Sequence, residues 1–111
     1  MTIEKLNELG ADTKTGLARC AGMEAFYLSL VEKSLRDTKY DELEGLIHEH
    51  KYKEAFEVAH ALKGVLANLS LTPVLKPVSE ITEGLRNQTE MDYSALLEQM
   101  KEARNCFLEQ A

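Results

Sequence analysis

At residues 55–69 the sequence reads AFEVAHALKGVLANL. An α-helix turns by about 100° per residue, so the apolar residues of this stretch fall on one stripe, which predicts an amphipathic helix with that stripe turned to the core. The stripe consists of Ala55, Val58, Ala59, Leu62, Val65, Leu66 and Leu69. His60 lies on the opposite side, so we expect its imidazole to stand in solvent.

The predicted face around His60 carries few bulky groups. Its members are Lys53, Phe56, Glu57, Gly64, Ala67 and Leu71, with Lys63 on the flank. A glycine inside a helix costs about 1 kcal/mol relative to alanine, and we interpret Gly64 as a place where another protein approaches the ring closely. Phe56 lies at the edge of the apolar stripe, so its ring either adds apolar area to a docking patch or folds into the protein.

Helical patterns continue on both sides of this stretch. Six glycines and two prolines punctuate the chain, and no segment alternates long enough for a strand. From Met23 to Asp37 the apolar residues Met23, Phe26, Tyr27, Leu30, Val31 and Leu35 form one stripe. Thr72 and Pro73 are a typical helix start, with threonine as the cap and proline at the first helical position, and Pro77 lies in the second turn.

The helices expected from these patterns are connected by short loops. The first three are Ile3–Leu9, a brief helix capped by Asp12 or Thr13 that ends before Ala21-Gly22, and Met23 to about Asp37. A shorter helix follows, which carries Leu43, Leu46 and Ile47 and ends near His50 and Lys51. The last three run from about Lys51 or Tyr52 to Ser70, from Thr72 to about Asn87, and from about Asp92 to Glu109. We therefore predict an all-α fold: an up-down-up-down antiparallel four-helix bundle with short N-terminal helices. With 111 residues, the chain forms one domain, residues 1–111.

Composition excludes several classes of function. The chain has 13 Lys and Arg against 19 Asp and Glu, a net charge of −6, which repels nucleic acid. No apolar run reaches the roughly 20 residues that span a bilayer, and the start lacks a targeting segment, so no membrane association and a cytoplasmic location are expected. Cys20 and Cys106 have no metal-binding spacing and are expected as reduced, half-buried thiols.

Two sequence stretches resemble the family of histidine-containing phosphotransfer (HPt) domains. Residues 59–69, AHALKGVLANL, are similar to the family signature, and residues 16–27, GLARCAGMEAFY, look like the segment with which such domains open. The resemblance covers the chain from about Gly16 to Arg86. It implies a helical bundle that takes a phosphoryl group from a receiver-domain aspartate, or from a histidine kinase, and passes it to a response-regulator aspartate.

By this resemblance His60 is the phosphoacceptor, Lys63 stabilises the phosphate charge and Gly64 gives the partner access. A solvated imidazole has an unperturbed pKa of about 6.5. An exposed histidine is therefore mostly neutral in the cytoplasm and can act as a nucleophile. Lys63, three residues on, can reach a phosphoryl group on His60. Phe56, Ala67 and Leu71, with Lys53 and Glu57 around them, are expected to form the docking patch.

The expected partners are receiver domains of hybrid sensor kinases and of response regulators, and a monomer is expected. No cofactor of its own is predicted, and the Mg²⁺ for the transfer should come with the receiver. The chain lacks a glycine-rich nucleotide loop, which indicates a carrier rather than a kinase.

Two other functions stay open at this point. One is a non-catalytic helical interaction module that binds receiver or kinase domains without chemistry. The other is metal binding through His48, His50 or His60. The first two are expected as surface residues, and the three lie on different faces.

Overall fold

The computed structural model of the protein describes residues 1–111 and consists of seven α-helices without a strand. The prediction of an all-α fold is therefore confirmed. The helices are α1 (Ile3–Glu8), α2 (Thr13–Arg19), α3 (Glu24–Leu35), α4 (Lys39–His48), α5 (Tyr52–Asn68), α6 (Thr72–Arg86) and α7 (Ser94–Leu108).

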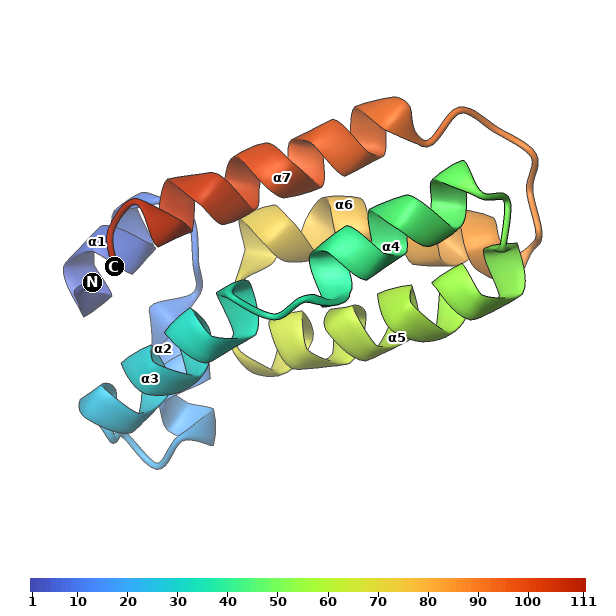
Figure 1. Cartoon of the computed structure of the whole chain (residues 1–111). Coiled ribbons are helices and arrows are strands. Elements are labelled where there is room, and N and C mark those ends of the chain that lie inside the picture. The colour runs from blue at the N-terminus through green and yellow to red at the C-terminus, as the bar shows by residue number, and fades with distance from the viewer.

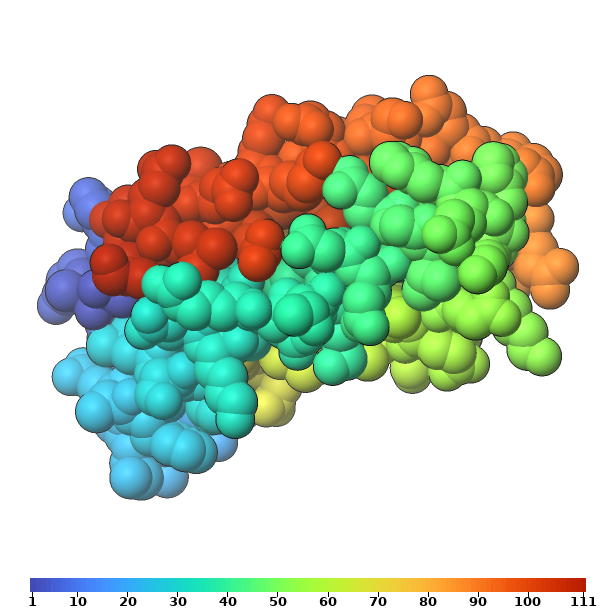
Figure 2. All heavy atoms as spheres, in the orientation of Figure 1, coloured from blue at the N-terminus to red at the C-terminus, as the bar shows by residue number.

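Four of these helices, α4 to α7, lie side by side along the molecule (Figure 1). Contacts join α4 to α5, α5 to α6 and α6 to α7, while α3 packs against α7 and α2. α1 lies at the end of the molecule that also holds both termini (Figure 1). The molecule is elongated, 41 × 24 × 19 Å, and Figure 2 shows α3, α4 and α7 covering the side that faces the viewer. α5 lies along the lower edge of this arrangement, so its outer face stays uncovered.

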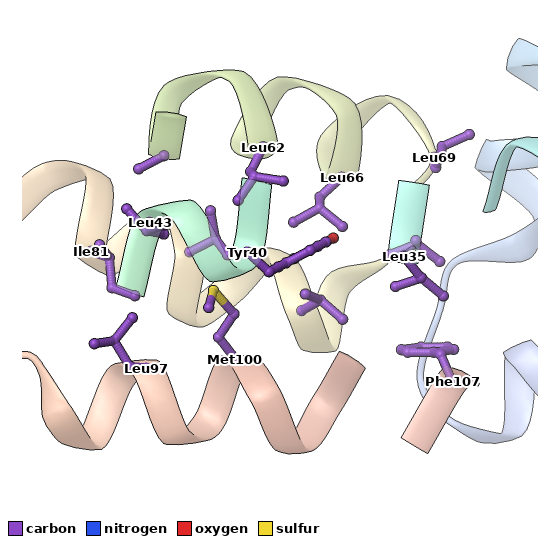
Figure 3. Packing of buried hydrophobic residues seen from close by; sticks show 14 of the residues in the cluster. Leu35, Tyr40, Leu43, Leu62, Leu66, Leu69, Ile81, Leu97, Met100 and Phe107 are labelled. Atoms are coloured by element: carbon purple, nitrogen blue, oxygen red, sulfur yellow. The ribbon is translucent and has the colours of Figure 1, made fainter. Parts of the chain in front are cut away.

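Buried side chains from α3 to α7 meet in one core (Figure 3). Leu62 and Leu66 of α5 lie on the opposite side of this core from Leu97 and Met100 of α7, with Tyr40 of α4 between them. All five side chains are at most 2% exposed. Full burial of a leucine contributes about 1.5–3 kcal/mol, so this contact layer fixes how α5 is rotated about its axis.

α3 buries a narrower stripe than its sequence predicts. Tyr27, Val31 and Leu35 are buried, but Met23 and Phe26 are 59% and 50% exposed. The prediction that Met23 and Phe26 face the core is wrong, because α3 lies at one end of the bundle and only α2 and α7 cover it closely. The N-terminal turn of α3 therefore leaves an apolar surface in solvent.

The turns in the N-terminal part follow the predicted breaks. Gly10, which ends the first helix, has φ +107°, and Ala21 and Gly22 have φ +55° and +73°, values that favour glycine. Asp12 caps α2, with its carboxylate accepting a hydrogen bond from the Thr15 backbone N–H at 3.2 Å. Both the stop at Gly10 and the break at 21–22 are confirmed.

α6 begins one residue earlier than its cap signal predicts. Leu71 is the N-cap residue and Thr72 is already helical, so Pro73 stands at the second helical position and no side chain caps the end. Pro77 is buried inside the helix, which continues through it to Arg86. A proline in the second turn removes one backbone donor, and the helix tolerates this loss.

Arg19 ties α2 to the end of the longest helix. Its guanidinium donates hydrogen bonds to the backbone carbonyls of Ala67 and Asn68. These carbonyls lie in the last turn of α5, where a helix leaves its acceptors unpaired and carries partial negative charge. Arg19 thus stabilises the C-terminal end of α5 from outside the bundle.

The cysteines differ from the prediction of two half-buried thiols. Both are free, but Cys20 is buried, at 8% exposure, and Cys106 is exposed on α7. Cys106 directly precedes the buried Phe107 on α7. Successive helix residues point about 100° apart, so the Cys106 side chain points away from the core and reaches solvent. No helix of the structure combines the length and the apolar character needed to cross a membrane.

Candidate functional site

His60 stands near the middle of α5 with its side chain exposed. The opposite face of the helix is buried through Ala55, Ala59, Leu62, Leu66 and Leu69. The prediction from helical periodicity is confirmed for these five residues and for the orientation of His60. The core packing of α5 therefore holds the imidazole outward.

Val65 and Val58 are the members of the predicted stripe that are not fully buried. Val58 is half-buried, whereas Val65 is 46% exposed, so the prediction that Val65 faces the core is wrong. Val65 of α5 and Leu69, the C-cap residue of that helix, line a shallow groove with Leu30 of α3. The polar side chains of Lys33, Asp37 and Asn68 rim it. α3 does not close over Val65, which leaves this side of α5 apolar and accessible.

Phe56 contacts the ring of His60. The two rings are stacked, with centroids 5.6 Å apart and 21° between their planes. Phe56 is half-buried and packs against the hydrophobic core, and the Arg86 guanidinium of α6 lies 5.3 Å from the centroid of its ring. Phe56 thus folds partly inward, and it also supports one face of the imidazole.

Lys63 leans toward α6 instead of standing free beside His60. Its Nζ lies 3.7 Å from Oε1 of Glu83, and the same carboxylate oxygen lies 3.4 Å from Nε of Arg86. Surface ion pairs of this kind contribute about 0–1 kcal/mol, so Lys63 can change partner easily. The structure therefore places a Lys63–Glu83–Arg86 cluster next to Phe56 and His60.

Sequence reasoning missed Glu83 and Arg86. They lie more than 20 positions beyond His60, and their only local signal is an i, i+3 pair of opposite charges on the polar face of the neighbouring helix. Such pairs are common on solvated helices. Only the packing of α5 on α6 brings this pair to the site.

Gly64 is exposed on α5, and a Cβ built at this position would meet no atom within 4 Å. The fold itself therefore does not require a glycine here. The space above Gly64 is open to a molecule that approaches His60 from solvent.

The predicted docking patch is only partly exposed. Lys53, Glu57 and Ala67 are exposed and Phe56 is half-buried, but Leu71 is fully buried. The prediction of an exposed Leu71 is wrong because the helix ends before it. Ser70 has φ +57°, which turns the chain out of α5 and directs Leu71 into the core at the start of α6.

His48 and His50 are exposed, as predicted. They lie where α4 ends and α5 begins, whereas Val65 lies near the other end of α5. The ring of His50 contacts that of Tyr52 in a tilted arrangement, with centroids 5.5 Å apart and 31° between the planes. The structure contains no group of three or more His, Cys, Asp or Glu side chains placed to hold a metal ion.

Comparison with known proteins gives one match. Residues 27–109 match the family described as the Hpt domain. This matched range begins later and ends later than the range of the sequence resemblance, Gly16 to Arg86. No curated protein and no solved structure matches the chain. The family match covers most of the chain, including α4 to α7 and the whole neighbourhood of His60. The chain therefore belongs to the Hpt domain family, whose members carry out phosphotransfer in two-component signalling.

Proposed function

We propose that the protein is a phosphorelay carrier that accepts a phosphoryl group on His60 and passes it to a response-regulator aspartate. The donor is the phosphorylated aspartate of a receiver domain or a histidine kinase. The observation that carries the proposal is the exposed imidazole in the middle of α5 of an Hpt domain, with Lys63 one turn away and open space above Gly64.

The chemistry is a direct transfer between two nucleophiles. A lone pair on a ring nitrogen of neutral His60 attacks the phosphorus of the receiver's aspartyl phosphate. The N–P bond forms as the P–O bond to the aspartate breaks, and that bond's electron pair leaves on the carboxylate. The proton on the other ring nitrogen stays on the ring or passes to water. Attack by His60 and departure of the carboxylate must be in line, which an outward-facing imidazole permits.

Charge neutralisation is the second requirement of this transfer, since its transition state is loose and spreads charge over the phosphoryl oxygens. We assign Lys63 to this role because its ammonium can donate a charge-assisted hydrogen bond to those oxygens. The chain supplies no further cation on the outer face of α5 beside His60 except Lys53, two turns away. The Mg²⁺ and the aspartate belong to the receiver, and the protein acts as a carrier without a nucleotide site of its own.

Docking of the receiver uses the outer face of α5. We propose that Lys53, Glu57 and Ala67 contact it, and that the exposed Val65 extends the apolar part of this surface toward the groove with α3. A Val65→Glu substitution should weaken receiver binding by about tenfold, the effect of losing about 1.4 kcal/mol at an interface position. Met91→Glu, at an equally exposed methionine in the loop before α7, should leave binding unchanged. Equal effects of the two substitutions would reject this surface.

For the arrangement of the bundle we propose the up-down-up-down order of α4 to α7, which the contacts between successive helices and their short connections support. A nitroxide on the exposed Cys106 tests it. In this order the C-terminal end of α7 lies beside the N-terminal end of α6, so amide signals near Thr72 should broaden and those near Arg86 should not. We further propose that the protein works as a monomer in the cytoplasm.

The competing function is a helical module that binds receiver or kinase domains without chemistry. Incubation of the protein with a ³²P-labelled receiver domain and Mg²⁺ distinguishes the two functions. A carrier becomes labelled during the incubation, and His60→Gln remains unlabelled while it still binds the receiver. Binding without label uptake by the native protein would establish the interaction module instead.

A further inference from the structure

Three charged side chains meet on the α6 side of His60. Oε1 of Glu83 lies 3.7 Å from Nζ of Lys63 and 3.4 Å from Nε of Arg86. One carboxylate therefore serves two cations. Arg86 is also anchored by the Phe56 ring, which stacks on His60, so the cluster and the imidazole form one continuous surface.

This arrangement keeps the candidate phosphate-stabilising group in contact with a carboxylate while His60 is unphosphorylated. Lys63 is about one-third exposed and Glu83 slightly more than half, so the pair is hydrated and weak. A phosphoryl group on His60 brings a charge of roughly −1.5 to −2 and several strong acceptor oxygens. The phosphoryl group and Glu83 then compete for the same ammonium.

The competition has a defined outcome for Glu83. If Lys63 turns to the phosphoryl group, Glu83 still keeps Arg86, its i, i+3 neighbour on α6. No carboxylate is left unpaired, and the exchange needs only side-chain rotation. Phosphorylation therefore costs the protein its Lys63–Glu83 ion pair, which stabilises only the unphosphorylated state.

We propose that Glu83 is a positioning residue that holds Lys63 before transfer and is exchanged for the phosphoryl group on His60. By this competition Glu83 limits the stability of the phosphohistidine, so the phosphoryl group moves on to the next aspartate instead of accumulating on the carrier. The inference rests on the proposed function of His60 and adds a residue of α6 that acts through Lys63.

The test compares Glu83→Gln with Glu102→Gln. Both substitutions remove one negative charge, but Glu102 is exposed on α7, which lies across the bundle from α5 (Figure 1), and has no ion pair. The measured quantity is the equilibrium distribution of phosphoryl group between a phosphorylated receiver domain and the protein. Glu83→Gln should shift this equilibrium toward the phosphorylated protein by about threefold, and should slow phosphohistidine hydrolysis, whereas Glu102→Gln should change neither.

A double-mutant cycle shows whether the effect passes through Lys63. In a Lys63→Met background, Glu83→Gln should lose most of its effect on the equilibrium. The shift should also shrink as salt is raised, because solvent reaches both side chains of the pair. Thermal unfolding of each variant, before phosphorylation, shows that a change in the equilibrium is not a change in folding.

The results separate this inference from the proposed function. A native protein that takes up no phosphoryl group overturns both. A native protein that takes up the group, with Glu83→Gln and Glu102→Gln behaving alike, overturns only the role of Glu83. An undiminished effect of Glu83→Gln in the Lys63→Met background also overturns the proposed role of Glu83. Glu83 would then act directly through its negative charge and not by holding Lys63.

Discussion

The ring of Phe56 stacks on the imidazole of His60, with 5.6 Å between the two centroids and 21° between the planes. Phe56 is itself held by the core on one side and by the Arg86 guanidinium on another. The proposed phosphoacceptor side chain is therefore exposed, but one of its faces rests on a supported aromatic ring. This contact restricts the orientations in which the imidazole meets a partner.

Removal of that support should slow phosphotransfer. Phe56→Ala lets the imidazole rotate more freely, and a less defined attack geometry should lower the transfer rate by roughly tenfold or less, while His60 still becomes labelled at long times. Rapid-quench measurement of label uptake gives the rate. Phe56→Tyr, which keeps the stacked ring, serves as the control and should transfer at nearly the native rate. If Phe56→Ala transfers as fast as the native protein, the stacking has no part in orientation.

Lys63→Ala should slow transfer and shorten the lifetime of the phosphohistidine by about five- to tenfold, the loss of one charge-assisted hydrogen bond of about 1–1.4 kcal/mol. The fold should persist because Lys63 is partly exposed and makes only one weak ion pair. Label uptake and label decay are the two measurements. Lys14→Ala, at an exposed lysine of α2, should change neither, and an equally unaffected Lys63→Ala would remove Lys63 from the site.

Gly64→Ala should stabilise the protein and impair its function. The added methyl group meets no atom of the chain within 4 Å, and alanine is favoured over glycine in a helix by up to about 1 kcal/mol. The same methyl group stands where a receiver approaches His60, so transfer should slow. Gly45 of α4 is the matched control, since it is also helical with open space at the Cβ position.

Gly45→Ala should therefore give a similar gain in the free energy of unfolding, measured by urea denaturation, with native transfer kinetics. A Gly64→Ala protein that transfers at the native rate would show that the glycine is not needed for access.

The buried hydroxyl of Tyr40 supplies a prediction about stability. This hydroxyl has no hydrogen-bond partner, although the Tyr40 ring packs under Arg104 at 4.7 Å. A buried polar group without a partner costs about 1–3 kcal/mol, so Tyr40→Phe should raise the free energy of unfolding by about 1 kcal/mol at pH 7. Tyr27→Phe, which removes a 2.8 Å hydrogen bond from the buried hydroxyl to the Leu69 carbonyl, should instead lower it.

Tyr40 should also make the free energy of unfolding fall at alkaline pH. Burial raises the pKa of Tyr40 to about 12, although the Arg104 guanidinium opposes this shift. The unfolded chain releases the Tyr40 proton near its ordinary pKa of about 10, while the folded chain keeps it. Stability from this group is thus complete below pH 10 and is lost between about pH 10 and 12, by up to about 3 kcal/mol.

Tyr40→Phe should lack this component, so its advantage over the native protein in urea denaturation should widen above pH 10. An advantage that stays constant from pH 7 to pH 11 would contradict the raised pKa.

Much of the fold could be predicted from the sequence because helical periodicity is a local property. The orientation of His60 follows from five buried residues of α5, and the stop at Gly10 follows from a residue that tolerates positive φ. The prediction failed where an element ends or lacks a neighbour. Leu71 lies past the end of α5, and Met23, Phe26 and Val65 lie where α3 leaves the surface open.

The candidate site was only half visible in the sequence. His60, Lys63 and Gly64 share one helix, so their spacing alone places them together. Glu83 and Arg86 reach the site through the packing of α6 on α5, which depends on contacts between residues far apart in the chain. No local pattern distinguishes them from an ordinary solvated ion pair.

The most direct test of the central claim is to locate the phosphoryl group on the chain. After incubation with a phosphorylated receiver domain and Mg²⁺, fragmentation mass spectrometry that preserves N–P bonds should find one phosphoryl group, on His60, with none on His48 or His50. His60→Gln should carry none. Phosphorylation at another residue, or equal labelling of the native protein and His60→Gln, would contradict the account.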